Sequence, residues 1–576
     1  MLDGGIMLSK NFKRVIYILI ILIIPLQLFS QNRTVGLFLN DTANTYKGYT
    51  LMAPNKYTST YLINNEGRLV HKWSNSAYSP GNSAYLLPNG HLLRTCKVAG
   101  SLAGGEGGRV EEYSWNDTLL WTFDYNTNMY ISHHDIKYLP NGNVLILAIE
   151  KKTIAQTMAS GFDTSKFLPE VFTNGYLLPD YIIEVQPTYP TGGTIVWQWH
   201  VWDHLIQDFD STKLNYGVVA NHPELIDADG AGDHLKSFWN HLNAINYNAA
   251  LDQIIVSCRS NSEIWIIDHS TTTTEAAGHS GGRYGKGGDL LYRWGNPICY
   301  KMGTASNRML YQQHDAEWVD PGLSGAGNMM VFNNGIGRNY SSSDQFAPPV
   351  DSLGFYYRAP GTAFGPTSLV WTYTATPPVS FFSATISGSQ RLPNGNTLIT
   401  SGVNGIFFEV TTSGQIVWKY VNPVINTGPL YYNDSIPSDP QNTGTYGNYV
   451  FKVHRYAPTY PGLIGKDLTP GNLIELYHTG VEGENNQIPS KFTLYQNYPN
   501  PFNPVTNIKY DLPKSSFVKL TIFDISGREI ETLVNEKQNQ GTYRINWNAS
   551  NYPSGIYFCR ISTDTQSETS KMILIK

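Results

Sequence analysis

Two adjoining units, QRLPNGNTLITSG at residues 390–402 and FFEVTTSGQIVWKY at residues 407–420, decide the fold of this chain. In each unit, two short runs rich in β-branched or aromatic residues flank a turn, Pro-Asn-Gly in the first and Ser-Gly in the second. Asn and Gly suit tight turns because both tolerate positive φ. Each unit therefore predicts a β-hairpin, and the pair predicts a sheet of four strands.

Both units recur along the chain. The second recurs as a strand that contains a tryptophan, at Trp73, Trp121, Trp199, Trp294, Trp371 and Trp418. The first recurs as YLLPNGHLLRT, KYLPNGNVLILA, INYNAALDQIIVS and EWVDPGLSGAGNMMVF, and more weakly as RYAPTYPG…TPGNLIELY. Six four-stranded sheets in a radial array leave only short, protected edges. We therefore expect an all-β fold with a six-bladed β-propeller over residues 32–480. Two stacked β-sandwiches are the alternative, but they would not require six matched tryptophan strands.

The two ends of the chain read differently. Residues 481–491 are a polar linker, and the strands at roughly ten-residue spacing in residues 492–576 predict a small immunoglobulin-like β-sandwich. Residues 1–31 place basic residues before the apolar run VIYILIILIIPLQLF, which is the pattern of a secretory signal peptide. That run contains a proline and is shorter than the roughly 20 residues of a spanning helix. We expect a cleaved signal and no stable membrane span afterwards; a transmembrane anchor is the alternative.

Composition excludes several classes of protein. The net charge is -5, only 15% of residues are charged, and no basic run is present, so nucleic acid is not an expected partner. The four cysteines are too widely spaced for a disulfide framework or a zinc knuckle, and we expect at most one structural bridge. The long polar stretches at residues 203–236 and 270–290 should form loops on one face.

Three histidines recur at one place in the first unit. His134, His241 and His314 each stand seven residues before a turn residue, and the same spacing marks Asn82 and Ser387. In the last blade the alignment is loose and leaves two candidates, Lys452 and His454. The innermost strands of a propeller line its channel, so these residues predict a polar ring. One histidine alone is more often a satisfied buried group; three at one register predict a shared site.

Other polar residues belong to the same region. Asn243 follows His241 on the same face of a strand, because side chains alternate. Arg259 lies on the neighbouring strand, where a buried guanidinium requires an anion. Its planar fork suits an oxyanion ligand. An internal carboxylate, Asp315 or Glu317, is an equally good partner at this stage.

The C-terminal segment closely resembles the sorting domain of proteins exported by the type IX secretion system. The residues that carry the resemblance are NYPNPFNP at 497–504, SGIY at 554–557 and the basic end KMILIK at 571–576. The resemblance implies handling by the type IX secretion machinery. It also implies transit of the periplasm and a secreted or cell-surface location in a Gram-negative bacterium.

The propeller region resembles the bacterial aryl-sulfate sulfotransferase family. The resemblance is carried by HHD, FWNHLNAI, SCRS and YQQHDAEW, which contain His134, Asp135, His241, Asn243, Arg259 and His314. It implies a six-bladed propeller that moves a sulfuryl group from a phenolic sulfate ester to a phenolic acceptor, with no cofactor and no metal. Two features depart from the family. The propeller follows the signal almost directly, which leaves dimerisation open, and a close cysteine pair is missing.

The resemblance also assigns roles. It makes His314 the nucleophile that becomes a sulfohistidine. His134, His241, Asn243 and Arg259 bind the sulfate oxygens, and either His134 or His241 acts as the general acid and base. We expect the neighbouring His133 to point the other way along its strand.

Two other functions are compatible with the same residues. Three imidazoles can bind zinc and leave a position for water, which would make a secreted hydrolase. A non-catalytic surface binding propeller is the other, because a fold alone does not define an activity. The pairing of Arg259 and Asn243 with the histidines favours an anion over a cation.

Overall fold

The structure is a computed structural model, and it describes residues 33–99, 102, 107–230, 235–440, 444–477, 489 and 491–576. The predicted signal at residues 1–31 and nearly all of the predicted linker at 481–491 lie outside these ranges. None of the described helices is long and apolar enough to cross a membrane.

Six blades make up the large domain, and each extends from an inner strand at the channel to an outer strand at the rim. In that order, blade 1 consists of β31 (His454–Tyr456), β2 (Tyr49–Met52), β3 (Thr60–Ile63) and β4 (Leu69–Trp73). Blade 2 consists of β5 (Pro80–Leu86), β6 (Leu92–Lys97), β7 (Gly108–Tyr113) and β8 (Leu119–Asp124). Blade 3 consists of β9 (Tyr130–Tyr138), β10 (Val144–Glu150), β13 (Asp180–Pro187) and β14 (Gly193–His200). Blade 4 consists of β17 (Leu242–Asn248), β18 (Gln253–Cys258), β19 (Glu263–Asp268) and β20 (Tyr292–Trp294). Blade 5 consists of β21 (His314–Trp318), β22 (Met329–Asn333), β23 (Ser342–Phe346) and β24 (Trp371–Tyr373). Blade 6 consists of β25 (Gly388–Arg391), β26 (Thr397–Ser401), β27 (Ile406–Val410) and β28 (Ile416–Val421).

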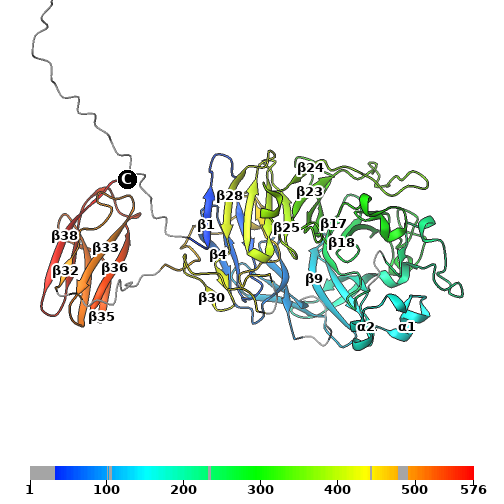
Figure 1. Ribbon diagram of the computed structural model, residues 1–576, viewed down its shortest axis with the longest axis horizontal. Coiled ribbons are helices and arrows are strands. Elements are labelled where there is room, and N and C mark those ends of the chain that lie inside the picture. The colour runs from blue at the N-terminus through cyan, green and yellow to red at the C-terminus, as the bar shows by residue number, and fades with distance from the viewer. Residues whose placement is uncertain are drawn as a thin grey trace, which may run out of the picture.

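The predicted all-β propeller is therefore confirmed, with two additions to the sheets. A bridge between Asn82 and His134 joins the inner strands of blades 2 and 3 into one eight-stranded sheet. The strand β1 (Gly36–Asn40) adds a fifth strand to the outer edge of blade 6. In Figure 1 the blue β1 accordingly lies beside the yellow-green β28.

The ring is closed by strands from opposite ends of the chain. In blade 1, β31 pairs with β2, and Arg455 stands opposite Thr50. The weak sixth copy of the first unit therefore supplies one strand of this blade, and its second half, TPGNLIELY, forms no named strand in the described range 444–477. The N-terminal strand β2 takes that place because it offers a free edge to β31.

The six tryptophans join each blade to the next. Each indole N–H donates to a backbone carbonyl of the following blade: Trp73 to Ser114, Trp121 to Gly192, Trp199 to Gly288, Trp294 to Pro366, Trp371 to Thr412 and Trp418 to Asn65, at 2.6–3.0 Å. The last bond returns from blade 6 to blade 1. The tryptophan repeat is thus also the hydrogen-bonded seam of the ring.

The turns form as the sequence predicts. In the Pro-Asn-Gly turn between β25 and β26, Gly395 has φ of 87°, and Leu392 and Asn396 close the turn through their backbones. A side chain at Gly395 would be strained by this φ, whereas glycine adopts it freely.

Helices are short and lie in the long connections. They are α1 (Ile154–Ala159), α2 (Pro169–Asn174) and α3 (Thr273–Ala276). Connections between the blade strands also carry paired short strands: β11 (Lys152–Thr153) with β12 (Tyr176–Leu177), β15 (Leu205–Ile206) with β16 (Ile226–Asp227), and β29 (Val424–Ile425) with β30 (Gly428–Pro429).

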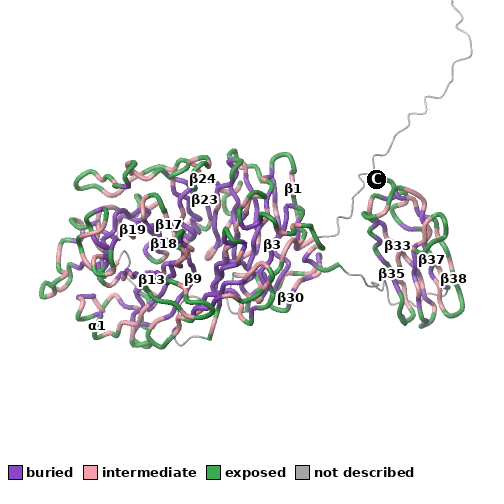
Figure 2. The backbone as a smooth tube through the Cα atoms, turned by 180° about the vertical axis from the view of Figure 1, so that it is seen from behind, coloured by how far each residue is buried: buried purple, intermediate pink, exposed green. Residues whose placement is uncertain are grey.

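The C-terminal domain is the predicted β-sandwich. One sheet holds β32 (Thr493–Leu494), β33 (Val505–Leu512) and β36 (Gly541–Asn548). The other holds β35 (Glu529–Gln538), β34 (Ser516–Asp524), β37 (Gly555–Ser562) and β38 (Ser567–Leu574). Trp547, Ile522 and Met572 belong to its own buried core. Buried residues follow the strands of both domains, and exposed residues follow the loops (Figure 2). All four cysteines are buried and free.

Candidate active site

The inner strands share an unusual backbone at the positions marked by the seven-residue spacing. φ is 137° at Asn82, 51° at His134, 56° at His241 and 91° at Ser387, and in blade 5 it is 55° at Asp315. Positive φ is uncommon for residues other than glycine and clusters at functional sites. The pairing register of β9, β17 and β21 shifts at or near these points. Each is therefore an irregularity of the β-bulge kind, which re-aims a side chain next to a site.

The bulges bring the predicted histidines together. The ring centroids of His134 and His241 lie 4.9 Å apart. Phe451 lies between His134 and His314, with its ring centroid 5.9 Å from that of His134 and 6.1 Å from that of His314. Phe238 stacks on His241 at 4.2 Å. The three imidazoles therefore share one neighbourhood with two aromatic rings, where an aryl group could also stack.

The expectation for His133 is wrong. Its Nδ1 lies 2.8 Å from Nδ1 of His134, so the two rings are in contact. Strict alternation would separate them, but the positive φ of His134 breaks the alternation. On its other side, Nε2 of His133 lies 3.0 Å from Oδ1 of Asp180, at an angle that makes no hydrogen bond. His133 is thus a support behind His134.

The tautomer of His314 follows from its neighbour Asn334. The amide nitrogen of Asn334 donates to the carbonyls of Ser383 and Ile386, at 2.8 and 2.9 Å. Its Oδ1 must then face Nδ1 of His314, 2.7 Å away, and it can only accept. The proton of the neutral ring is therefore on Nδ1. The lone pair is on Nε2, where the backbone N–H of Ile386 donates at 3.2 Å.

All three ring histidines are neutral at pH 7 in the free protein. Burial lowers the pKa of His134, His241 and His314 well below its ordinary value. The Arg259 charge lowers the pKa of each further. A neutral imidazole keeps the lone pair that a nucleophile needs.

Arg259 has no carboxylate partner among the described residues, although the sequence left Asp315 and Glu317 open for that part. Loss of solvent lowers the pKa of the guanidinium to about 10, and no neighbouring charge offsets this loss. Its backbone N–H donates to the carbonyl of His241 at 3.1 Å, which fixes it beside the ring. Positive charge is therefore left uncompensated at this point.

Lys452, and not Arg259, forms the ion pairs with the acids of the inner strands. Its Nζ lies 2.9 Å from Asp135 and 2.7 Å from Asp315, the two acids that directly follow His134 and His314. Asp135 also accepts from Tyr85 at 2.6 Å. Of the two candidates that the sequence left open, Lys452 and His454 on the inner segment of blade 1, Lys452 therefore joins the ring electrostatically. Its two ion pairs tie the strand of His134 to the strand of His314.

Asn243 is fully buried and turned toward blade 5. Its amide nitrogen donates to the carbonyl of Gln313 at 2.8 Å, immediately before His314. Among the described residues, its Oδ1 has no hydrogen-bond partner. This places Asn243 against the strand of His314, and its predicted contact with sulfate oxygens stays a prediction.

The ring does not have the geometry of a three-histidine metal centre. The described groups of three whose ligand atoms lie within 4.8 Å of one another do not include His134, His241 and His314. An anion site agrees better with this arrangement than a cation site does.

Sequence reasoning missed Phe238, Phe451 and Asn334. Phe238 stands in the quoted FWNH stretch, so its position offered a signal. Phe451 and Asn334 offered none, because each reaches the site from a loop outside the repeated units.

Comparisons with known proteins find two family matches in the chain. The profile described as Arylsulfotransferase (ASST) matches residues 37–428, and the Secretion system C-terminal sorting domain matches residues 496–576. No curated protein matches the chain. A protein of unknown function from Bacteroides caccae is 12% identical, with 71% of this chain and 98% of that one covered and a TM-score of 0.37. The periplasmic gluconolactonase of Pseudomonas aeruginosa is 8% identical, with 87% and 99% covered and a TM-score of 0.31. The virginiamycin B lyase of Staphylococcus aureus is 9% identical, with 68% and 85% covered and a TM-score of 0.30.

Proposed function

Since the chain belongs to the arylsulfotransferase family, we propose that it moves a sulfuryl group from a phenolic sulfate ester to a phenolic acceptor through a sulfohistidine at His314. The observation that carries this proposal is the unpaired guanidinium of Arg259 beside three neutral imidazoles. A sulfate ester is a monoanion with three equatorial oxygens, and its charge would compensate Arg259.

In the first step, the backbone N–H of Ile386 leaves Nε2 of His314 as the donor binds, and the freed lone pair attacks sulfur. The bond between sulfur and the aryl oxygen breaks, and its electron pair leaves with the phenoxide. His134 or His241 then gives the phenoxide a proton. That imidazole is neutral in the free protein, and the negative charge of the bound donor raises its pKa so that it takes up a proton with the donor.

The second step reverses the first with a new phenol. The imidazole left neutral removes the proton of the acceptor hydroxyl, whose oxygen attacks sulfur. The N–S bond breaks and its electron pair returns to Nε2 of His314. Asn334 keeps Nδ1 protonated throughout, so the ring can act as a leaving group.

Electrostatic stabilisation of the transition state lowers the barrier to sulfuryl transfer. Arg259 would hold the equatorial oxygens, where an oxyanion donor contributes about 3 kcal/mol. Phe238 and Phe451 would stack on the aryl ring of the donor or acceptor.

The C-terminal sorting domain directs the chain to secretion or to the cell surface. We propose that the type IX secretion machinery recognises residues 496–576, so that the propeller meets its phenolic substrates outside the cell.

The test is a donor-only incubation. Mixing enzyme with a chromogenic aryl sulfate should release about one equivalent of phenol as a burst, because sulfation of the nucleophile precedes acceptor entry. Mass spectrometry should place the sulfuryl adduct on His314. His314→Ala and His314→Asn should abolish both, since an amide fills the space without attacking sulfur.

Three outcomes would contradict the proposal. An adduct on His134 or His241 would exchange the roles of the histidines. Release of free sulfate that is lost with EDTA and restored by zinc would support a hydrolase. Tight donor binding with no phenol release would support a binding propeller.

A further inference from the structure

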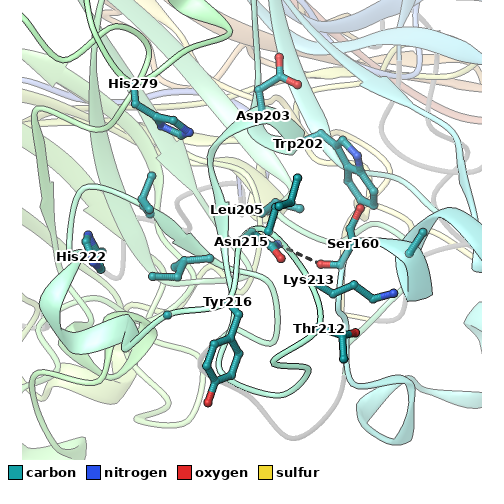
Figure 3. Close-up of a pocket in the computed structure, with 15 residues that line it drawn as sticks. Ser160, Trp202, Asp203, Leu205, Thr212, Lys213, Asn215, Tyr216, His222 and His279 are labelled. Carbon is teal, nitrogen blue, oxygen red and sulfur yellow. Dashed lines mark hydrogen bonds between the residues drawn. The ribbon is translucent and has the colours of Figure 1, made fainter.

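A second cluster of titratable side chains lies outside the central ring, between blades 3 and 4. His204 ends the 3-10 helix η2 (Val201–His204), which follows β14 directly. His279 and Asp289 belong to the loop between α3 and β20. One ligand atom from each of the three lies within 4.8 Å of the others. The cluster borders a cavity of about 590 Å³, and Figure 3 shows His279 among the residues that line it.

His204 is held rigidly in one orientation. It is fully buried and stacks on Trp199, with ring centroids 5.5 Å apart and an interplanar angle of 9°. Its Nε2 lies 2.9 Å from the carbonyl of Ala276, and a carbonyl only accepts, so Nε2 carries the proton. A Cβ on Gly288 would come within 2.6 Å of the same nitrogen, which leaves room only for glycine.

The other nitrogen of His204 then faces a carboxylate. Its Nδ1 lies 2.9 Å from Oδ1 of Asp289, and Nδ1 of His279 lies 2.7 Å from the same oxygen. In the neutral His204 ring this nitrogen holds a lone pair, and a lone pair opposite a carboxylate oxygen is repulsive unless a cation lies between them. A proton or a metal ion can serve as that cation.

The arrangement around His204 resembles the surroundings of a metal ligand. Histidines that bind metals usually donate their second ring N–H to a carbonyl or carboxylate, which fixes the tautomer and the ring. His204 does so to Ala276, and its Nδ1 points at the other members of the cluster.

We propose that His204, His279 and Asp289 bind a divalent transition-metal ion of the zinc class. Two imidazole nitrogens and one carboxylate oxygen suit zinc, whereas magnesium and calcium prefer oxygen ligands alone. Ligand atoms about 2.0–2.1 Å from zinc stand about 3.3 Å apart in a tetrahedron, so the Asp289 carboxylate has to withdraw by a few tenths of an ångström. The side chain of His279 is 62% exposed, so the fourth position is open to water.

The site would connect two blades. His204 comes from the end of blade 3 and Asp289 from the strand entry of blade 4, next to the carbonyl of Gly288 that accepts from Trp199. A metal ion here fixes the glycine-rich loop of residues 278–288 to the preceding blade. This role is separate from the sulfuryl chemistry at His314.

Zinc titration of the metal-stripped full chain tests the proposal. Calorimetry should give one equivalent bound, and cobalt(II) should show the visible absorption of a four-coordinate ion. Zinc should raise the melting temperature by a few degrees, because a ligand that binds only the folded state stabilises it. His279→Ala and Asp289→Asn should each weaken zinc binding by about a hundredfold and remove the thermal shift.

The matched control is His222→Ala. His222 lines the same cavity and is exposed to a similar degree, at 48% of its side chain, but it pairs with Glu224 outside the cluster. The His222→Ala variant should bind zinc as the unchanged protein does. The proposal is overturned if the unchanged chain shows no stoichiometric zinc binding, or if His222→Ala loses as much affinity as His279→Ala. It is also overturned if zinc shifts the melting temperature of His279→Ala by the full amount.

Discussion

Two desolvated arginines of blade 4, Arg259 in the turn after β18 and Arg293 in β20, have opposite surroundings. The guanidinium of Arg293 is fully buried and pairs with Glu263, with its Nε 2.8 Å from that carboxylate. The Glu263 charge raises the pKa of Arg293, whereas loss of solvent alone lowers the pKa of Arg259. Arg293 is therefore compensated within the fold, whereas Arg259 has no charged partner in the part of the chain that the structure describes.

This difference predicts opposite effects of one substitution. Arg259→Met removes an uncompensated charge and keeps most of the aliphatic volume, so it should raise the free energy of unfolding by about 1 kcal/mol. It should also slow the phenol burst by about a hundredfold or more, because the oxyanion loses its donor. Urea unfolding and burst kinetics measure the two effects.

The control is Arg293→Met, which leaves the buried Glu263 carboxylate without its ion-pair partner and should destabilise the protein by about 3–5 kcal/mol. If Arg259→Met destabilises the protein by a similar amount, then Arg259 has an internal partner and the anion site is refuted.

At the level of elements, the outer strands carry the hydrogen bonds that join neighbouring blades. Six indoles donate to six carbonyls in successive blades, so each blade is held to the next by the same bond. The tryptophans differ in burial. Trp199 is fully buried, and Trp371 is partly exposed.

Burial should decide how much each of these bonds contributes. Trp199→Phe leaves the Gly288 carbonyl unsatisfied in the interior and should lower the free energy of unfolding by about 2 kcal/mol. Trp371→Phe leaves the Thr412 carbonyl to water and should lower it by less than about 1 kcal/mol. Denaturant unfolding of the two variants measures the difference, and equal losses would mean that the seam bond is not what stabilises the ring.

For the whole molecule, buried neutral histidines couple stability to pH. Among the described residues, burial lowers the pKa of six histidines: His71, His133 (to about 3), His134, His241, His314 and His454. Below about pH 6.5 the unfolded chain binds protons that these groups in the folded chain do not, so stability falls as the pH falls. Asp180 and Glu317, whose pKa burial raises, act in the opposite sense and offset part of the loss.

His269 limits stability on the alkaline side. Asp252 and Glu184 bond to its two nitrogens, and these bonds raise its pKa to about 9 despite its burial. Its contribution is complete below about pH 6.5 and is lost as the pH rises through 9. Stability should therefore be greatest near neutral pH.

Urea unfolding at several pH values measures this coupling. Each histidine that stays neutral contributes a slope of about 1.4 kcal/mol per pH unit below pH 6.5, so several together should give a steep loss between about pH 6.5 and 5. If stability stays constant or increases as the pH falls from about 6.5 to 5, the site histidines are hydrated and protonated in the folded state.

The propeller and its site candidates could be predicted because they depend on local patterns. Alternation, glycine turns and the tryptophan strands repeat within each blade, and strand pairing between neighbours in sequence follows from them. The seven-residue spacing located His134, His241 and His314 because the inner strands of blades 3, 4 and 5 bulge at or next to the same step.

Only the tertiary structure decided the partners of these residues. Lys452 lies more than three hundred positions from Asp135, and Asn334 and Phe451 reach the site from loops outside the repeat. His133 contacts His134 because a positive φ interrupts the alternation on which the sequence prediction relied. Strand patterns report which face a side chain occupies when the backbone is regular. Ring closure and bulges instead depend on contacts between distant segments, which no local pattern contains.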